Sequence, residues 1–164
     1  MINLNQFIDI YMKKIILQKK IKQKKSIIDI IGINQTSCIN KLFLDEEFAE
    51  KKELMRRLKR KLSSYRSQDI KKKRYNQELF ITISALIEKL VISKLKCFYC
   101  KCDIMIFYNN VREPKQWTLD RINNNLPHNT DNVVIACLEC NLKRRCQDDK
   151  KFLFTKQMKI IKKY

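Results

Sequence analysis

Two Cys-x-x-Cys pairs constrain the fold of this chain more than any other feature. Cys97 stands with Cys100, and Cys137 stands with Cys140. Each pair places two thiolates on one side of a metal, so the two pairs together supply the four sulfur ligands of a tetrahedral structural Zn²⁺. The segment between the pairs is longer than that of a simple zinc ribbon and leaves room for an inserted hairpin. A structural zinc site at these four cysteines is therefore expected, with free thiols or disulfides as the alternatives.

The remaining cysteines do not extend this pattern. The chain has seven cysteines in all, and Cys38, Cys102 and Cys146 lack a Cys-x-x-Cys partner. Cys38 is expected to be a free thiol in a polar linker, and the other two are expected to be neighbours of the metal rather than ligands. Residues 1–22 mix Asp9 and several lysines into an apolar run, so they contain no signal core or membrane span. The protein is therefore expected to be soluble and intracellular, without membrane association. In a reducing compartment, cysteines are expected to bind metal rather than to form disulfides.

The charge balance indicates a polyanionic partner. The 164 residues include 36 Lys and Arg against 17 Asp and Glu, a net charge of +19. The excess is spread along the chain, at about +6, +7 and +6 over residues 1–44, 45–96 and 97–164. Such a surface suits nucleic acid or an acidic membrane. Nucleic acid is favoured because basic residues interleave with Tyr65 and Tyr75; a solvated basic face without a specific partner is the alternative.

Hydrophobic periodicity predicts helices over residues 1–33, 45–62 and 83–95, and a last helix that begins at Asp148. Thr82 is a good N-cap for the third helix. The segment 63–77 has too few large apolar residues to pack a core. It is predicted to be a basic arm that contacts phosphates, or else a solvated linker. The residues at its centre are Lys71, Lys72, Lys73 and Arg74.

Short apolar runs predict strands at 104–108, 117–119 and 133–136, followed by a helix at 139–146. The chain is therefore expected to be α+β. It divides into a variable N-terminal helical arm (1–44), a basic helix and nucleic-acid-binding arm (45–78), and a zinc-stabilised module (79–164).

The stretch 117–145 resembles the HNH endonuclease domain, the ββα-metal nuclease class, in its zinc-stabilised form. The family pattern runs from Cys-x-x-Cys through Leu-Asp-His-Ile and an Asn to Cys-x-x-Cys-Asn-x-x-Lys. Arg121 stands where most members have the histidine that activates water. The Asp-Arg-Ile variant resembles members from giant DNA viruses and phages, and the resemblance covers residues 59–159. The matching residues are Cys97, Cys100, Leu119, Asp120, Ile122, Asn132, Cys137, Cys140 and Asn141, with Arg144 at the basic position.

The resemblance implies a ββα module with a four-cysteine zinc site, preceded by basic amphipathic helices and followed by a C-terminal helix. It also implies that Asp120 and Asn141 hold a catalytic Mg²⁺ or Mn²⁺, which clamps the scissile phosphate. Asn132 would tie down the loop between the strands. Phosphate contacts are further expected from Lys143, Arg144 and Arg145.

Water activation is the point at which the chain departs from the family. Arg121 cannot be a general base because a guanidinium stays protonated, but it can bind a phosphate oxygen. His128 is the only histidine of the chain and lies in the same loop. It is a candidate base or proton relay, although a lone loop histidine commonly has no catalytic role.

The expected function is therefore a metal-dependent HNH endonuclease that hydrolyses phosphodiester bonds in DNA, which is favoured over RNA as the partner. The main alternative is a non-catalytic zinc-stabilised nucleic-acid-binding protein that keeps the fold, as a genome-packaging or ribonucleoprotein component. A third interpretation, a transcription-associated zinc protein that contacts other proteins, depends on the N-terminal helices alone.

Overall fold

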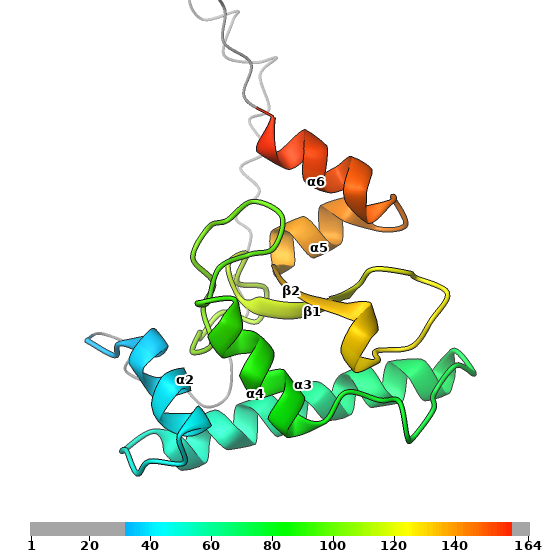
Figure 1. The fold of residues 1–164 in the computed structure, drawn as a ribbon. Helices are drawn as coiled ribbons and strands as arrows, with labels where there is room; N and C mark the ends of the chain where they lie inside the picture. The colour runs from blue at the N-terminus through cyan, green and yellow to red at the C-terminus, as the bar shows by residue number, and fades with distance from the viewer. Residues whose placement is uncertain (1–31, 159–164) are drawn as a thin grey trace, which may run out of the picture.

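The computed structural model describes residues 32–158, and the helix predicted within residues 1–33 lies almost entirely outside them. The described chain is α+β, with a small antiparallel sheet among helices (Figure 1). The elements are α2 (Gln35–Phe43), α3 (Lys51–Lys71), α4 (Ile83–Ile92), β1 (Trp117–Arg121), a 3₁₀ turn (Thr130–Asn132), β2 (Val133–Cys137), α5 (Leu138–Arg144) and α6 (Asp149–Gln157).

Strands β1 and β2 form the only sheet within residues 32–158. They pair antiparallel, with Thr118 opposite Ala136 and Asp120 opposite Val134. The prediction of a strand at 104–108 is wrong, because the structure has no strand there. Within this segment, Met105 makes a single bridge to Gln116. The next two backbone amides, of Ile106 and Phe107, donate to the Gln35 side chain at 2.8 and 2.9 Å rather than to a neighbouring strand.

Helix α3 lies along the free edge of β1 and is longer than predicted. It continues past residue 62 to Lys71 because its inner face stays buried, through Tyr65 and Asp69. Residues four apart share a helix face, which puts Tyr65 in line with Lys61. The Lys61 amine donates to the Trp117 carbonyl, and the Tyr65 hydroxyl accepts from the Leu119 amide at 3.0 Å. The first half of the predicted basic arm is thus a packed helix.

The start of α3 also differs from the prediction, which placed it at Asp45. Asp45 adopts a left-handed backbone conformation with φ of 57°, and the helix begins only at Lys51. The Lys51 amine binds the carboxylates of Asp45 and Glu47 at 2.9 and 2.7 Å. The acidic residues therefore form a turn that precedes the helix instead of its first turn.

Helices α2 and α4 pack together and close the core beneath the hairpin. The predicted N-cap is confirmed, since the Thr82 hydroxyl accepts from the Ala85 amide at 3.1 Å. Helix α2 occupies part of the stretch that was expected to be a polar linker. Its inner face buries Cys38, Ile39 and Leu42, so Cys38 is a core thiol.

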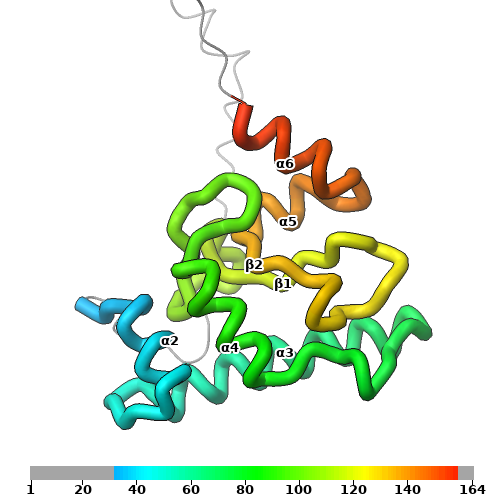
Figure 2. The backbone as a smooth tube through the Cα atoms, in the orientation of Figure 1, coloured from blue at the N-terminus to red at the C-terminus, as the bar shows by residue number. Residues whose placement is uncertain are grey.

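Several turns are built without glycine. The chain has a single glycine, and left-handed backbone conformations at other residues are energetically costly. Figure 2 shows the reversals of the trace after α3 and after α5, and each contains such a residue, Lys73 and Arg145. The non-glycine residues with positive φ in the described part of the chain are Asp45, Lys73, Lys94, Leu95, Lys101 and Arg145.

Candidate functional site

Four cysteines from two distant segments meet in one cluster. Cys97 and Cys100 lie in the turn after α4, whereas Cys137 ends β2 and Cys140 lies in the first turn of α5. Their Sγ atoms all lie within 4.8 Å of one another, and those of Cys100 and Cys137 are 3.9 Å apart. Tetrahedral zinc with bonds of about 2.3 Å requires sulfur–sulfur separations of roughly 3.8 Å. The cluster is a possible metal-binding site and is consistent with a zinc-binding module.

Hydrogen bonds favour the thiolate form, which a metal needs, at Cys97. The Cys137 amide donates to Cys97 Sγ at 3.3 Å, and the Cys140 amide donates to Cys137 Sγ at 3.4 Å. The hydrogen bond from the Cys137 thiol lowers the pKa of Cys97 to about 4, and it raises the pKa of Cys137. The pair of Cys97 and Cys137 therefore readily holds one negative charge, and a metal bound there would displace the remaining protons.

The other two cysteines of this region differ from each other. Cys102 is half-buried and its Sγ lies 3.3 Å from that of Cys100, whereas Cys146 is exposed. Cys102 thus contacts Cys100 at the side of the cluster but is not one of its four sulfurs.

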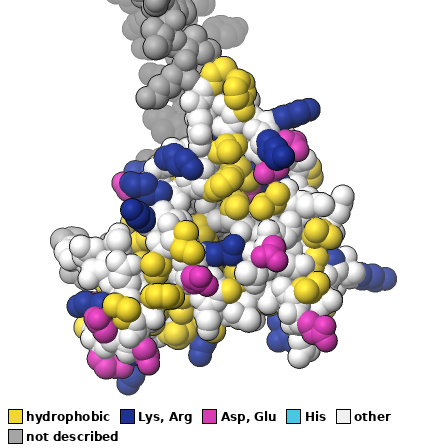
Figure 3. Space-filling view, viewed as in Figure 1, with side chains coloured by type: hydrophobic (Ala, Val, Ile, Leu, Met, Phe, Trp, Pro, Cys, Tyr) yellow, Lys and Arg dark blue, Asp and Glu magenta, His cyan; other side chains and the backbone are white. Residues whose placement is uncertain are grey.

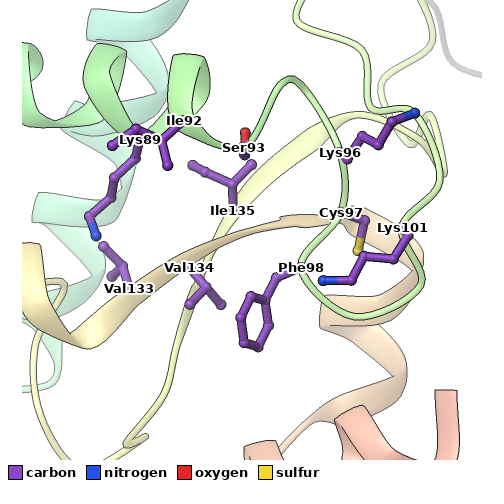
Figure 4. A pocket seen from close by; sticks show the side chains of 10 residues that line it. All are labelled: Lys89, Ile92, Ser93, Lys96, Cys97, Phe98, Lys101, Val133, Val134 and Ile135. Atoms are coloured by element: carbon purple, nitrogen blue, oxygen red, sulfur yellow. The ribbon is translucent and has the colours of Figure 1, made fainter. Parts of the chain in front are cut away.

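A pocket of about 460 Å³ opens beside this cluster. Figure 4 shows the amines of Lys89 and Lys101 at the two ends of an apolar strip. The Lys101 amine lies 5.3 Å from the centre of the Phe98 ring, and no acidic side chain lines the pocket. The cysteine turn therefore has positively charged surroundings. The lining residues are Lys89, Ile92, Ser93, Lys96, Cys97, Phe98, Lys101, Val133, Val134 and Ile135.

Asp120 is engaged inside the protein. Its side chain is buried, and its two oxygens accept hydrogen bonds from the Tyr99 hydroxyl at 2.8 Å and from Arg144 Nη1 at 3.0 Å. Burial raises the pKa of Asp120, while the bonds from Tyr99 and Arg144 oppose that shift. Arg144 neutralises the carboxylate.

Arg144 does not lie where a phosphate contact was expected. It is 1% exposed, because it lies on the face of α5 that packs against β1. Its Nη2 also donates to the Ile122 carbonyl at 2.7 Å, and its Nε has no partner within residues 32–158. Arg144 is therefore an internal ion-pair residue.

Asn141 faces the same side of the hairpin as Asp120. Its Nδ2 donates to the Thr118 hydroxyl at 3.1 Å and to the Leu119 carbonyl at 3.2 Å. A Mg²⁺ ion needs several oxygen ligands and bound waters. The structure brings Asp120 and Asn141 to one face, but the guanidinium of Arg144 already satisfies the charge of the carboxylate. In this arrangement the pair does not fit an open cation site.

Asn132 holds the loop between the strands. Its Nδ2 donates to the carbonyls of Asn123 and Pro127 at 3.0 and 2.9 Å, and its Oδ1 accepts from the Asn123 amide at 2.9 Å. The side chain thus fixes both ends of the loop over residues 123–127.

Arg121 and His128 lie on the side of the hairpin that faces α3. Arg121 is half-buried and donates to the Leu126 carbonyl at 3.3 Å. Its pKa is lowered by burial and by the nearby Arg74. His128 is buried against the Tyr65 ring, with centroids 4.7 Å apart.

Asp69 is the partner of His128, and sequence reasoning missed it. The two Asp69 oxygens bind the His128 amide at 2.8 Å and its Nδ1 at 2.9 Å. Burial lowers the pKa of His128 and outweighs the opposing effect of Asp69. The sequence contained a signal for this partner, because Asp69 lies four residues after Tyr65 and so falls on the same face of a helix. His128 therefore anchors the hairpin loop to α3.

The two basic clusters predicted from the sequence lie on either side of one residue, Asn124. Arg74 donates to the Asn124 carbonyl, and Asn124 Nδ2 donates to the Arg145 carbonyl at 3.1 Å. The end of α3, the hairpin loop and the turn after α5 share the right-hand side of Figure 1, and basic side chains project there in Figure 3. We term this surface the basic edge: Lys71, Lys72, Lys73, Arg74, Lys143 and Arg145.

Aromatic residues accompany the basic edge. The Arg66 guanidinium lies 5.0 Å from the centre of the Tyr75 ring, and Tyr75 packs on Phe80 with centroids 5.5 Å apart. Arg66 is exposed and both rings are half-buried. Cationic and aromatic side chains are thus available on one surface.

Comparison with protein families, curated proteins and solved structures finds no match. Within residues 32–158, no helix combines the length and apolar character that crossing a membrane requires.

Proposed function

We propose that this chain is a zinc-stabilised nucleic-acid-binding protein whose strand–strand–helix unit has the architecture of the HNH domain. The order of β1, β2 and α5 and the four-sulfur cluster support the resemblance. Zinc is the proposed metal because structural zinc sites are commonly formed by four cysteine sulfurs at the corners of a tetrahedron.

The observation that carries the proposal is the position of Asn124 between two basic segments that are far apart in the sequence. Its hydrogen bonds to Arg74 and Arg145 fix the loop between them. The anchoring of Asp69 to His128 also holds the chain just before Lys71. Cations on fixed backbone lose less conformational entropy on binding phosphates than cations on a free arm. Duplex DNA is the proposed ligand, in keeping with the family resemblance.

Salt-dependent binding tests the proposal. Each phosphate contact contributes about −0.9 to the slope of log K against log salt on duplex DNA. Replacing Lys71, Lys72 and Lys73 together by Gln should therefore make that slope shallower by about 2 to 3, measured by fluorescence anisotropy. Arg74 is left intact because it holds Asn124.

A matched variant in the N-terminal half of α3 provides the control. Lys52, Lys59 and Arg60 are exposed on α3, and their replacement by Gln removes the same charge. The control should keep the wild-type slope. Equal changes in the two variants would show that binding follows net charge alone and would contradict a defined basic edge.

The second candidate function is metal-dependent hydrolysis of DNA, with Mg²⁺ or Mn²⁺ at Asp120 and Asn141. One observation favours it: the two side chains face the same side of the hairpin. Two observations disfavour it. Arg144 occupies the carboxylate, and His128 is held in the interior by Asp69. Binding without cleavage is therefore the primary proposal.

Incubation with supercoiled plasmid separates the two functions. The wild type should bind the plasmid without nicking it in Mg²⁺ or Mn²⁺. Nicking that disappears in Asp120→Asn and Asn141→Ala, with DNA affinity retained, would establish the nuclease instead. Arg121→His then reports whether the family histidine at that position increases the rate.

A further inference from the structure

Cys102 is a fifth thiol in direct contact with the four-cysteine cluster. Its Sγ lies 3.3 Å from the Sγ of Cys100, two residues earlier. Lys101, between them, has a φ of 59°, which turns the chain back so that the two side chains point to the same side. The turn is fixed by bonds from the Lys101 amide to the Cys97 carbonyl at 3.0 Å and from the Cys97 amide to the Cys102 carbonyl at 2.9 Å.

The part of the cluster that holds Cys100 and Cys102 is also the part most accessible to solvent. Among the four clustered cysteines, Cys97, Cys137 and Cys140 are buried, whereas Cys100 is half-buried. Cys102 is half-buried as well. A small oxidant thus reaches the Cys100–Cys102 corner before the three buried sulfurs of the cluster.

We propose that Cys102 is an oxidation site, at which a hydroperoxide joins it to Cys100 in a disulfide and so withdraws Cys100 from the metal. The proposal rests on metal binding by the four cysteines and is independent of nucleic-acid binding. A disulfide needs a sulfur–sulfur distance of about 2.0 Å, so the two atoms approach by roughly 1.3 Å. Three ligands then remain, and zinc affinity falls.

The reaction balances with hydrogen peroxide as oxidant. The Cys100 sulfur attacks one peroxide oxygen, the O–O bond breaks, and Cys100 becomes a sulfenic acid while hydroxide leaves and takes up a proton as water. The Cys102 sulfur then attacks the Cys100 sulfur, and the S–O bond breaks. The departing hydroxide takes the Cys102 proton and leaves as a second water. Two thiols lose two electrons in total, and one peroxide is reduced.

The chain supplies a matched control. Cys146 is exposed, so it meets peroxide at least as readily as Cys102, but it does not belong to the sulfur cluster. Reactivity that depends on exposure alone would involve Cys146. Reactivity that depends on contact with Cys100 requires Cys102.

Zinc release under peroxide is the first measurement. Full-length zinc-loaded protein is treated with hydrogen peroxide, and free zinc is followed with a chromogenic chelator. Cys102→Ser should release zinc about tenfold more slowly than the wild type, because the resolving thiol is absent. Cys146→Ser should match the wild type. Equal release rates in Cys102→Ser and the wild type would overturn the proposal.

A disulfide map is the second measurement, and it does not depend on the metal. Trypsin cleaves after Lys101, so a bond between Cys100 and Cys102 holds two otherwise separate peptides together until reduction. Free thiols are first blocked with N-ethylmaleimide, and Cys97 should carry the label while Cys100 and Cys102 do not. Label on Cys102, with a bond between Cys97 and Cys100, would refute the assignment.

Discussion

The hydroxyl of Tyr65 accepts a hydrogen bond from the backbone amide of Leu119 at 3.0 Å. Leu119 lies in β1 opposite Ile135 of β2, and this amide points away from β2 toward α3. The exposed edge of a strand presents unsatisfied amides and carbonyls. Side chains of α3 satisfy two groups of this edge, since Lys61 also binds the Trp117 carbonyl. Helix α3 therefore takes the place of a third strand.

Tyr65→Phe should destabilise the fold by about 1–3 kcal/mol, because the buried Leu119 amide would lose its partner. Chemical denaturation measures the change. Tyr75→Phe is the matched control, since Tyr75 is half-buried at the surface, and it should change stability by less than about 0.5 kcal/mol. A Tyr65→Phe variant as stable as wild type would show that the bond contributes little.

Purified protein should contain one zinc per chain, and removal by a strong chelator should unfold the hairpin. The reason is that the cluster joins the turn after α4 to the end of β2, and the two-stranded sheet is too small to be stable alone. Elemental analysis and circular dichroism report the two effects. Cys137→Ser should lose the metal and Cys146→Ser should retain it; full zinc in Cys137→Ser would exclude the four-cysteine site.

Stability should decrease as the pH falls through about 6.5, the ordinary pKa of histidine. Burial lowers the pKa of His128 in the folded protein, so the unfolded chain binds a proton that the folded chain refuses. The free energy of unfolding then rises with pH across this window, by at most about 1.4 kcal/mol per unit for one proton. Denaturation between pH 5.5 and 7.5 measures the slope.

His128→Asn isolates this contribution. The variant should be less stable at every pH because Asp69 loses its ring partner, but its pH slope over the same window should be flatter. The thiols of the metal cluster titrate in both proteins, so the difference between the two slopes belongs to His128. Parallel slopes would assign the pH dependence to other groups.

Arg144→Met should cost about 3–5 kcal/mol, because it leaves the buried charge of Asp120 without a counter-ion. The double variant Arg144→Met with Asp120→Asn should recover much of that loss, since both charges are then absent. Thermal unfolding of the two single variants and the double variant gives the coupling energy. Additive losses would mean that Asp120 and Arg144 act independently.

The features that could be predicted from sequence are those with a local chemical signature. The paired cysteines predicted the four-sulfur cluster, the apolar runs predicted β1 and β2, and Thr82 marked the start of α4. Each of these depends on a few neighbouring residues whose spacing directly determines the geometry.

The features that were missed depend on contacts between distant segments. The length of α3 is set by Tyr65 and Asp69, whose partners Leu119 and His128 lie more than fifty residues away. The same reason explains Arg144, which looked like one of three successive surface cations until β1 placed Asp120 beneath it. Composition indicates that a residue is basic, but the fold decides whether its charge faces solvent.

The left-handed backbone conformations at Lys73, Lys94, Lys101 and Arg145 are positions at which substitution could increase the stability of this protein. A glycine at such a position avoids a conformational penalty of roughly 1 kcal/mol or more. Lys94 lies outside both the basic edge and the cysteine cluster. Lys94→Gly should therefore raise the melting temperature and leave zinc content and DNA affinity unchanged. At Lys73 and Arg145 the same exchange would remove a cation from the basic edge. At these two turns, a lower backbone strain and a larger positive charge are therefore mutually exclusive.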